Sequence, residues 1–157
     1  MKITPKWLQK HKWMIRSSKN GVSYNDFKWP ECGLWIDCPD WDEEPECGCG
    51  FHGETKAHNG SGILYSRLEL VEFRGKPIPI DGNKVKVRRA RIVAIGNAIP
   101  QTAFTLCGYK IAHDGDTISP IKGDRWLILE GDVTVSNQSG GVCWFYDSAT
   151  GTVSNQS

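Results

Sequence analysis

The segment KVKVRRARIVAIG, residues 84–96, restricts the fold of this chain more than any other feature. Apolar and charged residues alternate along it, and a period of two residues is typical of a β-strand that buries one face. Val85 and Val87 are expected to face a core, and the lysines beside them to face solvent. The alternation breaks at Arg88–Arg89, which predicts a β-bulge there. The fold is therefore expected to be built around a sheet.

Composition and turn signals also favour a β-rich fold. The 157 residues include seven tryptophans and 17 glycines, a combination that suggests many turns and large aromatic anchors. Asn20-Gly21 is a strong hairpin-turn signal. Residues 5–16 suit a short amphipathic helix or a strand beginning at Trp13. We predict a mostly β, α+β fold, with a compact β-rich domain over residues 1–100 and a β appendage over residues 101–157.

The predicted appendage contains an internal repeat. The sequence TVSNQS occurs at residues 134–139 and again at 152–157, 18 residues later. This spacing is roughly one turn of a small β-solenoid, in which stacked turns bury a narrow apolar column. Solenoids usually need three or more repeats, so a terminal β-hairpin is the alternative.

The sequence indicates neither membrane insertion nor secretion. It has no run of about 18 apolar residues, and its basic N-terminal segment lacks the apolar stretch of a secretory signal. We therefore expect a cytoplasmic protein with reduced thiols. The formal net charge is only +1, whereas a strongly basic nucleic-acid-binding protein would carry a clear excess of positive charge.

Residues 27–53, FKWPECGLWIDCPDWDEEPECGCGFHG, carry the pattern W-P-x-x-G…P-D-W-D-x-x-P-x-C-G-x-G-[LF]-H-G. This pattern resembles the N-terminal domain of a family of uncharacterised phage and prophage proteins, often followed by Gly/Ser-rich β repeats. The resemblance extends from residue 13 to about residue 97. It implies a phage or prophage source, hence the cytoplasm of a bacterial host or the virion. It implies no particular function, and no catalytic assignment comes with it. The matching positions are Trp29, Pro30, Gly33, Pro39, Asp40, Trp41, Asp42, Pro45, Cys47, Gly48, Gly50, His52, Gly53, Lys84 and Val85.

The same segment contains ligand types that Zn²⁺ prefers. Cys47, Cys49 and His52 form a C-x-C-x2-H group with Cys38 as a fourth ligand, and Cys32 and His58 are alternatives to Cys38. The C-x-C spacing is tighter than the usual zinc knuckle, and the family pattern keeps only one of the cysteines and the histidine. The competing interpretation is a set of small buried thiols beside a hydrogen-bonded histidine.

Two enzymatic hypotheses remain open at this point. Cys47 and His52 could form a nucleophilic dyad, because a neighbouring imidazole can deprotonate a thiol. An ADP-ribosyltransferase-like site would require Arg16, His52 and either Glu69 or Glu72 to converge, which rests on fold analogy alone. No residue that would orient either site is apparent, so a non-enzymatic role is favoured.

Charge and aromatic residues suggest binding roles. The acidic loop from Asp37 to Glu46 is expected to oppose a basic strand, and a partner-binding surface is expected at Trp35, Trp41, Asp40 and Asp42. The basic strand could instead contact nucleic acid through phosphates, or the two charged segments could simply neutralise each other. The leading expectation is an accessory protein that acts by protein binding or self-assembly, as a virion component or as an inhibitor of a host defence protein. The basic residues concerned are Lys84, Lys86, Arg88, Arg89 and Arg91.

Overall fold

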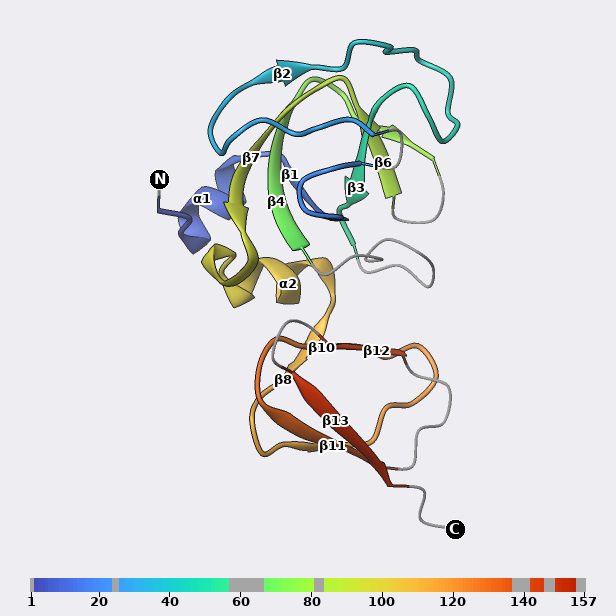
Figure 1. The fold of residues 1–157 in the computed structure, drawn as a ribbon. Coiled ribbons are helices and arrows are strands. Elements are labelled where there is room, and N and C mark those ends of the chain that lie inside the picture. Colours follow the sequence, from blue (N-terminus) through green and yellow to red (C-terminus); the bar gives the residue numbers. More distant parts are fainter. Residues whose placement is uncertain are drawn as a thin grey trace. The chain divides into compact units, whose positions relative to one another are not determined.

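The computed structural model describes residues 2–23, 26–56, 67–80, 84–136, 142–145 and 149–154. The chain forms two compact units, Met1–Ala103 and Phe104–Ser157 (Figure 1). Strands hold 44% of the residues and helices 13%, which confirms a mostly β, α+β fold. Among the described residues, no helix is both long and apolar enough to cross a membrane.

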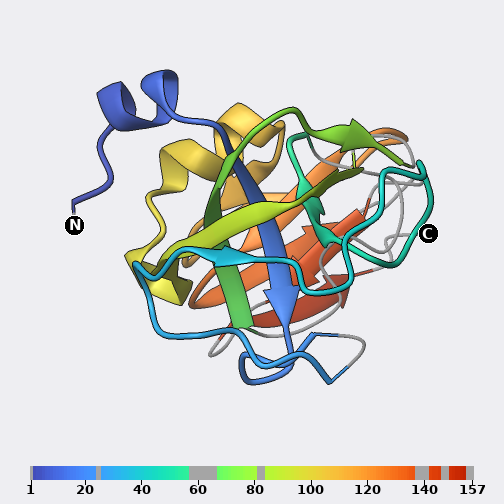
Figure 2. The same cartoon turned by 90° about the horizontal axis from the view of Figure 1, so that it is seen from above.

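The N-terminal unit is built on one seven-stranded antiparallel sheet (Figures 1 and 2). Its strand order is β2-β7-β4-β1-β3-β6-β5. A short helix comes first, because the Oγ1 of Thr4 accepts a hydrogen bond from the backbone of Trp7 and Pro5 occupies the first turn. The elements are α1 (Pro5–Lys10), β1 (Trp13–Ser18), β2 (Ile36–Asp37), β3 (Phe51–Glu54), β4 (Arg67–Arg74), β5 (Ile78–Pro79), β6 (Lys84–Val87), β7 (Arg89–Ile95) and the 3₁₀ turn η1 (Gly96–Ala98).

The predicted turn at Asn20-Gly21 is confirmed. Both residues have positive φ angles, 54° and 82°, and Lys19 pairs with Val22 across the turn. These angles are those of a type I′ turn, in which Asn and Gly are the preferred central residues. The turn follows β1 directly and brings the next segment back over the sheet.

The predicted β-bulge at Arg88–Arg89 is wrong. The chain changes strand at Arg88: β6 pairs with β3 and β5, whereas β7 pairs with β2 and β4. The register shift lies instead between Leu70 and Val71 of β4. β6 and β7 are four places apart in the sheet order, yet one residue joins them, so the sheet must curl until these two strands approach each other.

One face of the curled sheet holds the core of this unit. Trp29 and Cys38, from the long segment between β1 and β3, are buried against it with exposed fractions of 7% and 8%. Trp41 is only partly buried against the same core, and Leu34 is exposed. The tryptophan-rich segment is therefore held to the sheet at two points and leaves the rest accessible. The strand residues of the core are Met14, Phe51, Val71, Phe73, Val85, Val87, Ala90 and Ile92.

The C-terminal unit contains two three-stranded parallel sheets, β12-β10-β8 and β13-β11-β9, between which the chain alternates. Repeated residues lie opposite each other, with Thr134 paired to Thr152. This is the strand arrangement of a β-solenoid, whereas a hairpin would need antiparallel pairs. The remainder of each repeat lies outside the described residues. The elements are α2 (Gln101–Cys107), which spans the unit boundary, β8 (Lys110–Ala112), β9 (Thr117–Ile118), β10 (Arg125–Ile128), β11 (Asp132–Ser136), β12 (Val142–Phe145) and β13 (Thr150–Ser154).

Candidate functional site

The three cysteines among the four proposed zinc ligands have separate partners. The Sγ of Cys38 donates a hydrogen bond to Asp40 at 3.0 Å, and the Sγ of Cys47 accepts one from Lys84 at 3.5 Å. Burial and the contact with Asp40 raise the pKa of the Cys38 thiol to about 12. A hydrogen bond with Asp42 raises the pKa of the Cys49 thiol. All six cysteines are free thiols.

A zinc site is therefore not supported. Within the described ranges, no group of three or more His, Cys, Asp or Glu side chains could hold a metal ion. The alternative ligand His58 lies outside those ranges. The thiols of Cys38, Cys47 and Cys49 instead contact neighbouring carboxylates or a lysine. The competing interpretation expected buried thiols, and within this segment that holds only for Cys38, because Cys32 and Cys47 are exposed.

Lys86 ties the acidic loop to the sheet. Its side chain was expected to face solvent, but only 1% of the residue is exposed. Its Nζ donates to the Oδ1 of Asp42 at 2.5 Å and to the backbone oxygen of Glu44 at 2.7 Å, and lies 5.5 Å from the ring centre of Trp41. Gly50 leaves room for this side chain, because a Cβ there would overlap its Cγ. Asp42 thus attaches the acidic loop to β6 through Lys86. Because Lys86 is buried, an external phosphate cannot reach it.

His52 is a weak base in this fold. It lies within strand β3, opposite Lys86 of β6. Burial, then the charges of Lys84 and Lys86, lower the pKa of His52 to about 4. Its Nε2 is buried and has no hydrogen-bond partner within the described residues. The thiol of Cys47 contacts Lys84, so the structure offers no support for a Cys47–His52 dyad.

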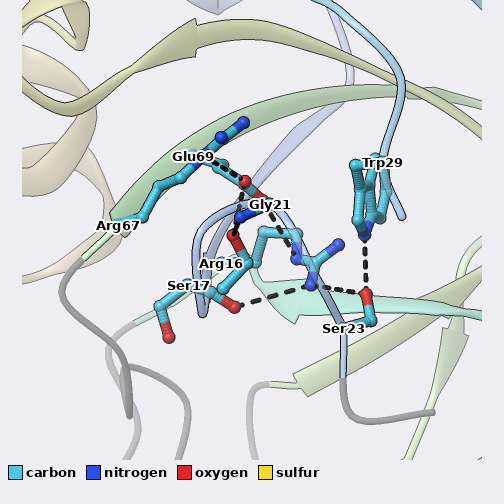
Figure 3. A network of polar contacts seen from close by, with 8 residues as sticks. Arg16, Ser17, Gly21, Ser23, Trp29, Arg67 and Glu69 are labelled. Atoms are coloured by element: carbon cyan, nitrogen blue, oxygen red, sulfur yellow. Dashed lines mark hydrogen bonds and ion pairs between the residues drawn. The ribbon is translucent and has the colours of Figure 1, made fainter. Parts of the chain in front are cut away.

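Arg16 and Glu69, two members of the ADP-ribosyltransferase-like set, do meet (Figure 3). They lie opposite each other on β1 and β4, and the Nε of Arg16 is 3.5 Å from the Oε2 of Glu69. Glu69 is fully buried; its Oε1 accepts from Ser18 at 2.7 Å and lies 2.9 Å from the Nε of Arg67. Burial lowers the pKa of Arg16 to about 10, although Glu69 acts in the opposite direction.

This buried network has a structural role. The guanidinium group of Arg16 lies 4.2 Å from the ring centre of Trp29 and donates to the Oγ of Ser23, which also accepts from the indole of Trp29 (Figure 3). The Oγ of Ser18 accepts from the backbone of Gly21, so the network fixes the hairpin turn to β4. Glu72, the other candidate carboxylate, binds His11 and Arg91 instead.

An exposed arginine cluster surrounds the half-buried Trp35. The guanidinium carbons of Arg74, Arg91 and Arg89 lie 4.4, 4.8 and 6.0 Å from the centre of its ring. Trp35 directly precedes β2, Arg74 ends β4, and Arg89 and Arg91 belong to β7. These three strands are neighbours in the order β2-β7-β4, and Arg74 lies directly opposite Arg89. Sequence analysis missed Arg74, because only the cross-strand register brings residue 74 beside residue 89.

A groove of about 510 Å³ continues from this cluster. Arg74 belongs to both, and the groove is further lined by Trp41, Ile78, Arg88 and Lys76, with Glu43 at its edge. We call the cluster and the groove together the Arg–Trp surface. It comprises Trp35, Trp41, Arg74, Lys76, Ile78, Arg88, Arg89 and Arg91.

Of the predicted surface residues, the structure thus gathers Trp35, Trp41 and three arginines. Lys84 contacts Cys47 instead, and Lys86 is buried beside Trp41, where it binds the acidic loop. Comparisons of the chain with protein-family models, curated proteins and solved structures found no match.

Proposed function

We propose that this protein acts by assembling with other copies of itself and catalyses no reaction. The observation that carries the proposal is the strand arrangement of the C-terminal unit. The last three residues of β13 repeat the last three of β11, and the two strands pair in parallel register from Asp132–Thr150 to Ser136–Ser154. No further described strand pairs with the other side of β13. A free strand edge is a template for pairing with another chain.

The N-terminal unit supports a non-enzymatic role. The proposed nucleophile, Cys47, is an exposed thiol whose Sγ accepts a hydrogen bond from Lys84, and no contact between it and His52 is recorded among the described residues. A general base is most effective with a pKa near the working pH, whereas the pKa of His52 is about 4. The buried carboxylate of Glu69 is bound by Ser18, Arg16 and Arg67. Glu69 thus stabilises the fold through these contacts.

Taken with the resemblance of residues 27–53 to phage and prophage proteins, assembly through a repetitive β unit fits a virion component. Such components occur in many identical copies. The free edge of β13 in one copy could therefore pair with a strand of the next copy, and the same contact would recur between all copies. An inhibitor of a host defence protein would not need self-assembly. The oligomeric state therefore separates the two roles.

The test is the mass of the full chain in solution. The backbone N–H of Thr150 points to β11, where it binds the oxygen of Gly131 at 2.9 Å, so the N–H of Val153 points to the free edge. By light scattering after gel filtration, the wild type should have a multiple of 17.5 kDa. Val153→Pro, which lacks the N–H, should shift the mass to the monomer, whereas the control Val153→Thr should not. A wild type that stays at 17.5 kDa at every concentration would refute the proposal.

A further inference from the structure

We propose that the Arg–Trp surface binds single-stranded nucleic acid. This proposal does not depend on self-assembly, because the surface belongs to the N-terminal unit and the β13 edge to the C-terminal unit. It shares Arg88, Arg89 and Arg91 with the sequence-based hypothesis. It differs in leaving out Lys84 and Lys86, which the structure engages elsewhere, and in adding Arg74 and Lys76.

The first observation is an excess of positive charge held close together. Arg74 and Arg89 lie directly opposite each other on neighbouring strands, an arrangement of like charges that destabilises a sheet. Asp37 pairs with Arg89 at 3.4 Å and Glu72 with Arg91 at 2.7 Å. In contrast, no ion pair is recorded among the described residues for the exposed side chains of Arg74, Lys76 and Arg88. An anion beside Arg74 would relieve this repulsion.

The second observation is the apolar lining of the adjoining groove. Trp41, Ile78 and neighbouring prolines line a space of about 510 Å³, and Arg74, Lys76 and Arg88 line the same space. This volume lies within the range of small-ligand sites, roughly 300–1,000 Å³. A flat base could lie on the apolar lining while its phosphate reaches the cations.

Together the two observations favour one class of ligand. Proteins that bind single strands combine a positively charged groove with aromatic side chains on which bases stack. Duplex bases are stacked on one another and are not free to enter a side groove. An acidic polypeptide would meet the charges but has no flat rings to place against Trp41. Two carboxylates, Glu43 in the groove and Asp37 paired with Arg89, would limit the affinity of this surface.

The experiment measures the fluorescence anisotropy of a labelled 20-nucleotide oligothymidylate with the full chain, over a range of salt concentrations. Binding should be weak at physiological salt, with a Kd of about 10⁻⁶ to 10⁻⁴ M. For single strands the slope of log K against log salt is about −0.7 for each phosphate neutralised, so three to five cations predict about −2 to −3.5. The tryptophan fluorescence should be quenched on binding, because bases stack on the rings.

The decisive variant is Arg74→Gln/Arg88→Gln. It should weaken binding by about tenfold or more at low salt and reduce the steepness of the slope by about 1.4, that is, 2 × 0.7. The matched control Lys6→Gln/Lys122→Gln removes the same charge from two exposed positions elsewhere and should leave both quantities near the wild-type values.

Four outcomes would overturn the proposal. They are the absence of any oligothymidylate binding at low salt, equal loss in the variant and its control, equally tight binding of a duplex of the same length, and equal competition by polyglutamate. The last two would show that charge alone, without base stacking, accounts for the binding.

Discussion

Replacing Glu69 by glutamine should destabilise the N-terminal unit strongly. Glu69 is fully buried between Arg16, which is 8% exposed, and Arg67, whose side chain is 29% exposed. Removing one partner of a buried ion pair typically costs about 3–5 kcal/mol, because a charge is left uncompensated. Arg67 can turn toward water, and Arg16 keeps Ser23 and the ring of Trp29. The lower end of the range, about 3 kcal/mol, is therefore expected for Glu69→Gln.

Urea denaturation followed by tryptophan fluorescence at pH 7 measures this loss. A change of about 3 kcal/mol corresponds to a fall in Tm of at least about 12 °C for a unit of this size. The matched control is Glu72→Gln on the same strand. The side chains of its partners Arg91 and His11 are 23% and 36% exposed, so neither is as deeply buried as that of Arg16, which is 9% exposed. Glu72→Gln should cost about 1 kcal/mol or less. If Glu69→Gln costs no more than the control, the network does not stabilise the fold as argued.

Three further predictions concern protonation, thiols and packing. The pKa of His52 is lowered from its ordinary value of 6.5 to about 4 in the fold, so the free energy of unfolding should fall as the pH decreases from 6.5 to 4. The urea midpoint of His52→Asn should depend less steeply on pH in that window than that of the wild type. Iodoacetamide labelling of native protein at pH 8, read by mass spectrometry, should modify exposed Cys32 well before Cys38, and equal rates would contradict the burial argument. Gly53→Ala should lower the free energy of unfolding by about 1–3 kcal/mol, because its Cβ would lie 2.7 Å from the Cγ of Met14; an unchanged denaturation midpoint would show that this side chain moves freely.

Local features were predictable where local chemistry decides the structure. The Asn20-Gly21 turn was correct because a type I′ turn needs residues that accept positive φ. The N-terminal segment was ambiguous between a helix and a strand, and it contains both, α1 and then β1. The spacing of the TVSNQS repeat matches the parallel pairing of β11 with β13 in the structure.

The candidate site was much less predictable, because it depends on which strands become neighbours. Alternation placed Lys86 on a solvent-facing side of its strand, but the acidic loop covers that side and buries the lysine. The double arginine was interpreted as a bulge, although Arg88 is where the chain passes between strands that are distant in sheet order. Arg74 belonged to no predicted site.

The sequence alone determined that the chain forms β-structure, where it turns and which segment repeats, since alternation and turn chemistry act between residues a few positions apart. Tertiary structure alone decided which charges are buried, which thiols are protonated and which arginines surround Trp35. Those properties depend on cross-strand register and on which loop covers which face, and both arise from contacts between residues far apart in the chain.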